Sequence, residues 1–526
     1  MRSHTTPCSS CAALAATLLL TFTTAAQSQQ RPDAATAAWW AQTVALSNDS
    51  MEGRDTGTEA YERAANYVAD QFKAAGLKPA GDNGTYFQRV PMHQVDLVEA
   101  KSSVEILNPS GKSITLHFTT EVTTVPREAT FSTEAPLVFI GYGPTPADAD
   151  LKGKIAVFFN NTPGNLPQKD RDTFTTRRLR TLAQAGVAAV IFIDNPSATE
   201  PFHWPAAYAR SVTITGATAP AATTPIVIRI NPASLDALFA ASNHKPSDII
   251  TAGGKGAELE TFPLNVTARI NLISTSKDIS SPNILAILPG SDPKLASEYV
   301  ALSAHLDGYG YGTPVLGDNL YNGTLDDAAY VALLIELAKN QQHKAPARSL
   351  LFCIFTGEEK GLLGSAYFTQ HLTVPKENIV ADLNLDQLRP IFPLNILTME
   401  GLNDSTLGDT VRTVAAPFKI EIRPDLEPER NLFRRADNNN FVRIGVPIAS
   451  FIFGYDKGSP EEVTYRDWYA RRYHKPQDDI KTPIDWDAAA KFNRFYTALT
   501  LNIANAPTRP QWLSSSPNSP HRKAEQ

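Results

Sequence analysis

The sequence predicts an α/β protein with a mostly parallel mixed sheet covered by helices on both faces. From Glu298 onward, apolar strand-like runs alternate with segments of helical periodicity, which is the pattern of strands joined by crossover helices. The chain has 526 residues, more than one core usually organises, so we expect several domains. Hydrophobic residues make up 42% and charged residues 19%, which excludes a largely disordered chain and a multi-span membrane protein.

The first 26 residues have the layout of a signal peptide. Arg2 precedes an apolar run over residues 12–22, and small residues follow it up to Ala26. The run is shorter than the roughly 20 apolar residues that span a bilayer. We therefore expect residues 1–26 to be removed on export, and the mature protein to be secreted or periplasmic without a membrane span.

Charge and cysteine content exclude two further possibilities. The chain has 54 acidic and 48 basic side chains and a net charge of −6, without the positive field that nucleic-acid binding requires. Of the three cysteines, only Cys353 follows the signal peptide, so the mature protein cannot form an intramolecular disulfide. Cys353 lies in the apolar run 350–355, and we interpret it as a buried side chain.

The mature chain opens with an amphipathic helix and then changes character. Apolar residues recur at helical spacing over 58–75, with Thr56 and Glu59 in the positions of a capping box. Residues 118–262 are richer in Pro, Thr and Ala, and short strands are expected at 137–140, 154–159, 187–193 and 224–230, with one helix at 175–185. We predict a small β-rich domain at 118–262, inserted into a main domain made of 27–117 and 263–510. The polar residues 511–526 are expected to form a disordered tail.

The second half of the main domain carries the α/β pattern. We expect strands at 299–304, 349–355 and 379–385, and helices at 326–339 and 361–371. Ligands of such folds bind outside the carboxyl ends of the strands. The functional site is therefore expected at that edge of the sheet.

Histidine and acidic residues follow the ends of these strands. His305 and Asp307 come after the first, Glu358 and Glu359 after the second, and Asp386 after the third. Carboxylates buried together repel one another unless cations neutralise them. Imidazole and carboxylate groups without a thiolate suit Zn²⁺ or a similar divalent ion. The sequence therefore predicts a metal site.

Five motifs in this order resemble peptidase family M28, a family of zinc aminopeptidases. They are AHLD at 304–307, GDNLYNGTLDD at 317–327, TGEEKGLLGS at 356–365, NLD at 384–386 and YHKPQDD at 473–479. The motif MEGRDTG at 51–57 also resembles the amino-terminal region of bacterial members. Residues 118–262 resemble the protease-associated domain often inserted in them, so the resemblance covers nearly all of the mature chain.

The resemblance implies two zinc ions per chain and a set of ligands for them. Asp326 would bridge the ions. His305 and Asp386 would hold one ion, and Glu359 and His474 would hold the other.

The resemblance also implies three catalytic roles. Glu358 would be the general base acting on a water that bridges the metals. Asp307 would orient the imidazole of His305, and Tyr473 would donate a hydrogen bond to the developing oxyanion or serve only in packing.

These features predict an exported metallo-aminopeptidase that hydrolyses amino-terminal residues from peptides or proteins. A glutaminyl cyclase on the same fold remains an alternative, because it shares the fold and several of the acids. Carboxypeptidase or dipeptidase activity also stays open, because no residue is identified that recognises a free amine. A non-catalytic binding protein is disfavoured by the presence of all five predicted ligands and Glu358.

A few positions depart from the usual motifs of the family or stand outside them. Tyr330 places a large ring at the start of the helix after Asp326, and Arg389 stands near Asp386 where a methionine continuation is commoner. We expect these departures to change the pocket and not the ligand set.

In the inserted segment, His203 and Trp204 are candidates for substrate contact or for packing.

Overall fold

The computed structural model describes Met1 and residues 31–143, 150–216, 224–386 and 389–519. The predicted signal peptide falls almost wholly outside these residues. The chain divides into two units at Arg31, and the fold belongs to the unit Pro32–Gln526. Among the described residues, no helix combines the length and the apolar character needed to cross a membrane.

A ten-stranded sheet forms the centre of the main domain. Its four central strands run parallel, and antiparallel pairings flank them on both sides. The strands in order are β19 (Glu421–Arg423), β18 (Ile396–Glu400), β20 (Ile448–Gly454), β17 (Ile379–Asn384), β13 (Tyr299–His305), β16 (Ser349–Phe355), β12 (Ser274–Leu288), β2 (Phe87–Leu97) and β9 (Arg210–Ile214), with β1 (Lys78–Pro79) paired to β12. The predicted mixed α/β sheet is confirmed, although its flanks are more antiparallel than the alternating pattern predicts.

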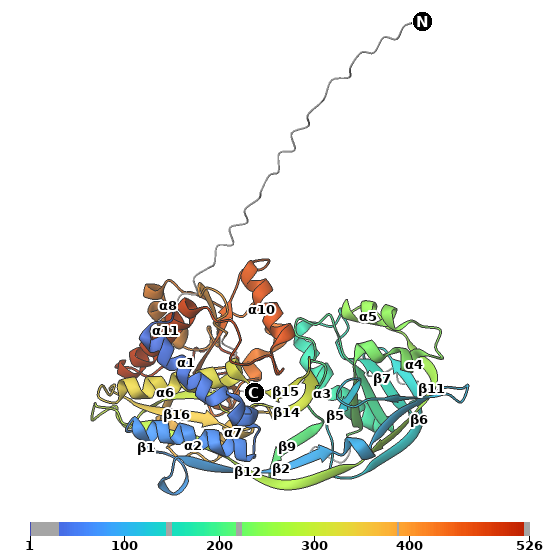
Figure 1. Cartoon of the computed structure of the whole chain (residues 1–526), viewed down its shortest axis with the longest axis horizontal. Coiled ribbons are helices and arrows are strands. Elements are labelled where there is room, and N and C mark those ends of the chain that lie inside the picture. The colour runs from blue at the N-terminus through green and yellow to red at the C-terminus, as the bar shows by residue number, and fades with distance from the viewer. Residues whose placement is uncertain (2–30, 144–149, 217–223, 387–388, 520–526) are drawn as a thin grey trace. The chain divides into compact units, whose positions relative to one another are not determined.

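Helices cover both faces of this sheet, and its central strands β16, β17 and β20 are buried at every position. Alternate residues of β13 and β16 face a large core with α1 (Ala34–Ser47), α2 (Glu59–Ala74), α6 (Ala329–Gln341), α8 (Leu407–Ala415) and α11 (Trp486–Asn505). The other residues face a smaller core with α7 (Leu363–Gln370) and α9 (Asn438–Arg443), and Cys353 is buried there as expected. Figure 1 shows α1, α2 and α6 lying along the sheet.

The amino ends of two helices differ from the prediction. Helix α2 is capped by the side chain of Thr58, which accepts a hydrogen bond from the backbone N–H of Tyr61, and not by Thr56. Helix α6 begins at Ala329, three residues later than predicted. The preceding turn over Thr324–Ala328 contains non-helical backbone at Asp326 and Asp327, which turns these two acids toward the carboxyl edge of the sheet.

A second sheet of eight strands forms the β-rich part of the chain. Its order is β4 (Ser113–Leu116), β3 (Ser103–Leu107), β11 (Thr261–Leu272), β6 (Phe131–Ile140), β7 (Ile155–Phe159), β8 (Ala189–Ile193), β10 (Ile226–Ile230) and β5 (Val122–Thr124), with helices α3 (Gln168–Gln184), α4 (Asp236–Phe239) and α5 (Pro246–Gly254). The four expected strands are present. The sheet spans 103–272, which is wider than 118–262, because β3 pairs with the end of β11 and β4 pairs with β3. The assignment of this part as an inserted protease-associated domain stays a prediction.

One strand from the inserted stretch pairs with the main sheet instead. β9 follows the loop 194–209 and pairs antiparallel with β2 from Met92↔Ile214 to Asp96↔Arg210. The hairpin of β14 (Gly310–Val315) and β15 (Asp318–Tyr321) contacts the same loop, since the N–H of Thr313 donates to the carbonyl of Ala207. The loop 194–209 is thereby held beside the edge where the site is expected.

The carboxyl-terminal segment corrects one prediction. Residues 511–519 are not a disordered tail. Trp512 donates a hydrogen bond to the carbonyl of Gly445, and Ser516 and Asn518 donate to the two carboxylate oxygens of Asp404. A segment held by individual hydrogen bonds has no periodicity, so its sequence resembles that of a free tail. Residues 520–526 lie outside the described part of the chain.

Candidate metal centre and active site

Parallel pairing brings the predicted strand-end residues to one edge. His305, the last residue of β13, pairs in register with Phe355, the last residue of β16. Ser303 pairs with Asn384, which ends β17. Glu358 and Glu359 therefore emerge beside His305 on one side, and Asp386 emerges on the other.

Two groups of potential metal ligands share Asp326. His305, Asp326 and Asp386 form one group, and Asp326, Glu359 and His474 form the other, with the ligand atoms of each group within 4.8 Å of one another. The Nε2 atom of His305 lies 3.3 Å from Oδ1 of Asp326, whereas the Nε2 atom of His474 lies 3.3 Å from Oδ2. The two imidazoles thus face different oxygens of one carboxylate.

The electrostatics of this cluster call for cations. Burial raises the pKa of Asp386. The charge of His305 lowers this pKa, and the nearby Asp326 carboxylate raises it. Burial likewise raises the pKa of Glu358, as do the charges of Asp386 and Glu359. The buried Oδ2 atom of Asp326 makes no hydrogen bond within the described residues. Nitrogen and carboxylate donors around such an atom suit Zn²⁺, so the residues present fit a pair of divalent ions.

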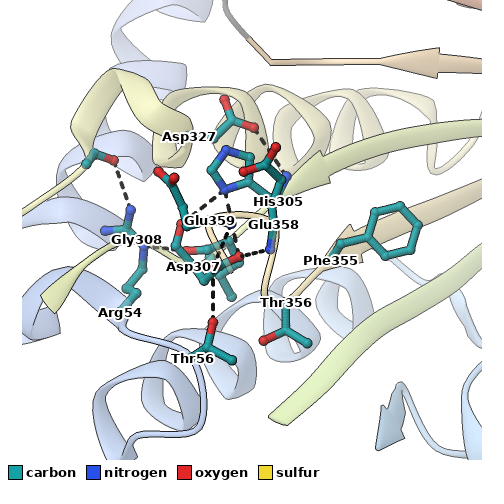
Figure 2. Close-up of polar contacts among 12 residues, drawn as sticks. Arg54, Thr56, His305, Asp307, Gly308, Asp327, Phe355, Thr356, Glu358 and Glu359 are labelled. Carbon is teal, nitrogen blue, oxygen red and sulfur yellow. Dashed lines mark hydrogen bonds and ion pairs between the residues drawn. The ribbon is translucent and has the colours of Figure 1, made fainter. Parts of the chain in front are cut away.

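Asp307 contacts the predicted general base as well as His305 (Figure 2). Its backbone carbonyl oxygen lies 3.0 Å from Nδ1 of His305, whereas its carboxylate is 3.8 Å from that nitrogen. The carboxylate instead accepts hydrogen bonds from the backbone N–H groups of Glu358 and Glu359 and from the hydroxyl of Thr56. The ring is therefore oriented by the carbonyl, and the carboxylate fixes the loop that carries the two glutamates.

Two further buried residues, each within a quoted motif, fix the backbone of the site without having been predicted. The Arg54 guanidinium donates to four carbonyl oxygens, including those of Leu306 and Gly323. The Asp478 carboxylate accepts hydrogen bonds from the backbone N–H groups of Leu325 and Asp326. Both roles depend on contacts with residues far away in the sequence, which no local motif reveals.

Arg389 is a buried cation beside the shared carboxylate. Its Nη2 atom lies 3.7 Å from Oδ2 of Asp326, and its guanidinium stacks over the Trp468 ring at 4.4 Å. The sequence placed an unusual residue near Asp386 but did not predict its charge to face Asp326. Gln387 and Leu388 lie outside the described residues.

A cavity of about 810 Å³ opens beside this cluster. Glu359, Tyr473 and His474 line one side, and Glu200, His203 and Tyr208 of the inserted stretch line the other. The rings of His203 and Tyr473 are 5.3 Å apart, whereas Trp204 donates to Asp194 within its own domain. His203 thus faces the cavity that leads to the cluster.

Tyr473 and Tyr330 occupy different surroundings. The Tyr473 ring is buried and stacks on the His474 ring at a centroid distance of 3.7 Å, so both its predicted roles stay open. Tyr330 is buried in the large core near Phe492 and does not line the cavity. The expectation that its ring changes the pocket is therefore wrong.

Comparison with known proteins identifies the domain that carries the site. Residues 283–500 match the model of Peptidase family M28, and this range contains all five predicted ligands and Glu358. The chain carries an M28 peptidase domain. The predicted M28 resemblance is confirmed for this domain, and the mixed α/β fold agrees with the predicted fold class.

Relatives of the M28 domain include named peptidases. The chain is 24% identical over 415 residues to probable leucine aminopeptidase 2 of Aspergillus fumigatus, covering 77% of this chain and 69% of the relative. It is 31% identical over 232 residues to a probable zinc metalloprotease of Pyrenophora tritici-repentis, covering 41% of this chain and 48% of that protein. The predicted class, a zinc-dependent hydrolase of the aminopeptidase type, agrees with these names.

Solved structures share the fold beyond the M28 domain. An aminopeptidase from Aneurinibacillus sp. strain AM-1 aligns with a TM-score of 0.59 at 19% identity, over 90% of this chain and 95% of its own. BSAP, a zinc aminopeptidase from Bacillus subtilis, aligns with a TM-score of 0.54 at 18% identity, over 92% and 97% of the two chains. The common architecture therefore includes most of the chain outside 283–500.

Proposed function

We propose that the protein is an exported di-zinc aminopeptidase that removes amino-terminal residues from peptides. The observation that carries the proposal is the position of Asp326, which belongs to both ligand groups and presents one oxygen to each imidazole. In this assignment His305 and Asp386 hold one ion and Glu359 and His474 hold the other.

Glu358 is the proposed general base. It belongs to a third group of close ligand atoms with His305 and Glu359, so its carboxylate lies beside the metal cluster. Bound zinc would supply Lewis acidity to polarise the scissile carbonyl and to activate a water molecule. Glu358 would accept the proton of the attacking water and pass it to the leaving amine. Its backbone is held for this task by Asp307.

The cavity supports action on chain ends. The loop 194–209 forms a wall opposite Tyr473 and His474, and Glu200 of this loop pairs with Arg430 and Arg435 of the main domain. A walled cavity admits an extended peptide end more readily than the middle of a folded chain. The names of the relatives favour the amino-terminal end, and the layout of residues 1–26 supports export.

The proposal is tested by metal analysis and by a peptide panel. The purified protein should contain two zinc ions, and chelation should abolish cleavage of free peptides until zinc is restored. Amino-blocked versions of the same peptides should resist cleavage. Equal cleavage of blocked and free peptides would reject the aminopeptidase, and loss of ammonia without hydrolysis would identify a cyclase instead.

A further inference from the structure

Tyr309 lies between two of the proposed ligands, although no predicted role falls on it. It follows Asp307 by two residues, in the turn before β14. Its hydroxyl oxygen is 3.1 Å from Nδ1 of His474, and Glu359 lines the same small pocket as Tyr309 and His474. One side chain therefore lies beside both ligands that the second ion does not share with the first.

The two nitrogens of His474 have different partners, which fixes the direction of these hydrogen bonds. Nε2 faces carboxylate oxygens of Asp326 and Glu359 at 3.3 Å each, so this nitrogen is the metal ligand. A metal-binding nitrogen carries no proton, which leaves the proton on Nδ1. Nδ1–H then donates to the oxygen of Tyr309, and the hydroxyl hydrogen of Tyr309 is available to Glu359.

The Tyr309 ring is itself held firmly. Its ring lies 5.9 Å from that of Tyr208 and 6.0 Å from that of Tyr321, and the Nζ atom of Lys360 lies 4.9 Å from its centroid. Lys360 pairs in turn with Asp55 at 3.1 Å. A ring confined on these sides presents its hydroxyl in one position.

His474 needs such support because its backbone is in the left-handed region, with φ at 53°. A non-glycine residue keeps this conformation only when its surroundings impose it. The stacked Tyr473 ring fixes the plane of the imidazole, and the Tyr309 hydroxyl fixes its rotation within that plane.

The other imidazole is supported in a different way. Nδ1 of His305 faces the backbone carbonyl of Asp307, which no side-chain substitution removes. The imidazole of the second ion is thus supported by a tyrosine and that of the first by a backbone carbonyl, and this difference makes the role of Tyr309 separable from a general effect on the site.

We propose that Tyr309 is a positioning residue that joins His474 to Glu359 and thereby sets the affinity of the second zinc ion. The inference rests on the proposed di-zinc function. Partners of this kind usually change metal affinity by about 10-fold to 100-fold when they are removed.

The test measures zinc binding by Tyr309→Phe and by the unmodified protein, through titration in zinc buffers with metal analysis and through the visible spectrum of the Co²⁺ forms. We expect the zinc affinity of one of the two binding steps to fall by about tenfold or more while that of the other stays unchanged, with an altered Co²⁺ spectrum. Tyr311→Phe, an exposed tyrosine two residues away, is the matched control and should match the unmodified protein.

Each outcome separates the two proposals. Failure of the unmodified protein to bind two zinc ions would reject the proposed function itself. Normal two-zinc binding with unchanged affinities in Tyr309→Phe, or an equal loss at both steps, would overturn the role of Tyr309 alone. If Tyr309→Phe does not fold, Tyr309→Gln and Tyr309→Leu decide: glutamine retains an oxygen acceptor and N–H donors, so equal affinities in these two variants would also overturn it.

Discussion

The carboxylate of Asp307 accepts a hydrogen bond from the backbone N–H of Glu358 at 3.1 Å. This contact joins the segment after β13 to the loop after β16, so the position of the proposed base depends on a residue that also touches His305. Thr56 donates to the same carboxylate at 3.0 Å and extends the connection to the amino-terminal motif. The Asp307 carboxylate thus positions the proposed base, whereas the Asp307 backbone carbonyl orients the metal-binding imidazole of His305, so a side-chain substitution changes the first contact and leaves the second.

Glu358→Gln should leave both zinc ions bound and lower kcat by about 10²-fold to 10⁴-fold. The amide has nearly the same shape but cannot take a proton from water. Metal analysis and steady-state kinetics on one free peptide check this, with the exposed Glu377→Gln as control. A variant with normal kcat would remove Glu358 from the mechanism.

Asp307→Asn should lower kcat by roughly tenfold without loss of zinc. An amide group replaces one of the two oxygens that accept the N–H groups of Glu358 and Glu359, whereas the carbonyl that orients His305 remains. Zinc content and kcat are measured together. Loss of one zinc ion would show that the carboxylate, and not the carbonyl, orients the imidazole.

Glu200→Gln should raise KM several-fold and leave kcat nearly unchanged, because it weakens the wall of the cavity and not the metal cluster. Glu200 forms paired hydrogen bonds with Arg435 at 2.9 and 3.0 Å, and these contacts with the Arg430 charge hold its pKa at about 2 despite burial. Kinetics on short peptides test the change, with the exposed Glu258→Gln as control. A loss of kcat at constant KM would contradict this role.

Glu400→Gln should make the protein more stable than the parent above pH 7. Burial and the charge of Asp425 raise the pKa of Glu400 to about 7 from 4.5, so the folded state retains a proton that the unfolded state loses. The parent therefore loses stability as pH rises from about 4.5 to about 7, by at most about 3 kcal/mol. Denaturant unfolding at pH 5 and pH 8, with the exposed Glu260→Gln as control, measures the difference. If Glu400→Gln raised the free energy of unfolding by the same amount at both pH values, the proposed titration of Glu400 would be contradicted.

The sequence predicted those parts of the site that follow from regular structure. His305 ends a parallel strand, Glu359 and Asp386 follow soon after the ends of two others, and parallel pairing brings such positions to one edge. Asp326 and His474 come from loops, so only the family motifs indicated them.

The remaining parts depend on contacts that no local pattern encodes. Tyr309 and His474 are 165 residues apart, and Asp478 lies 153 residues from Leu325, whose N–H it binds. The edge of the second sheet was missed for a similar reason, because β3 and β4 are short strands, and β3 joins the sheet only by pairing with the distant β11. The docked segment 511–519 has no periodicity to reveal it.

The placement of β9 has a consequence for any attempt to simplify the protein. This strand covers β2 at the end of the main sheet, and its Val212 packs with Val90 and Met92. Removing the inserted stretch would expose the backbone N–H and C=O groups of β2 beside apolar side chains. Such an exposed edge strand can pair with other chains and cause aggregation. Truncated versions built for crystallography or biotechnology should therefore keep β9, even where the rest of the insertion is dispensable to their purpose.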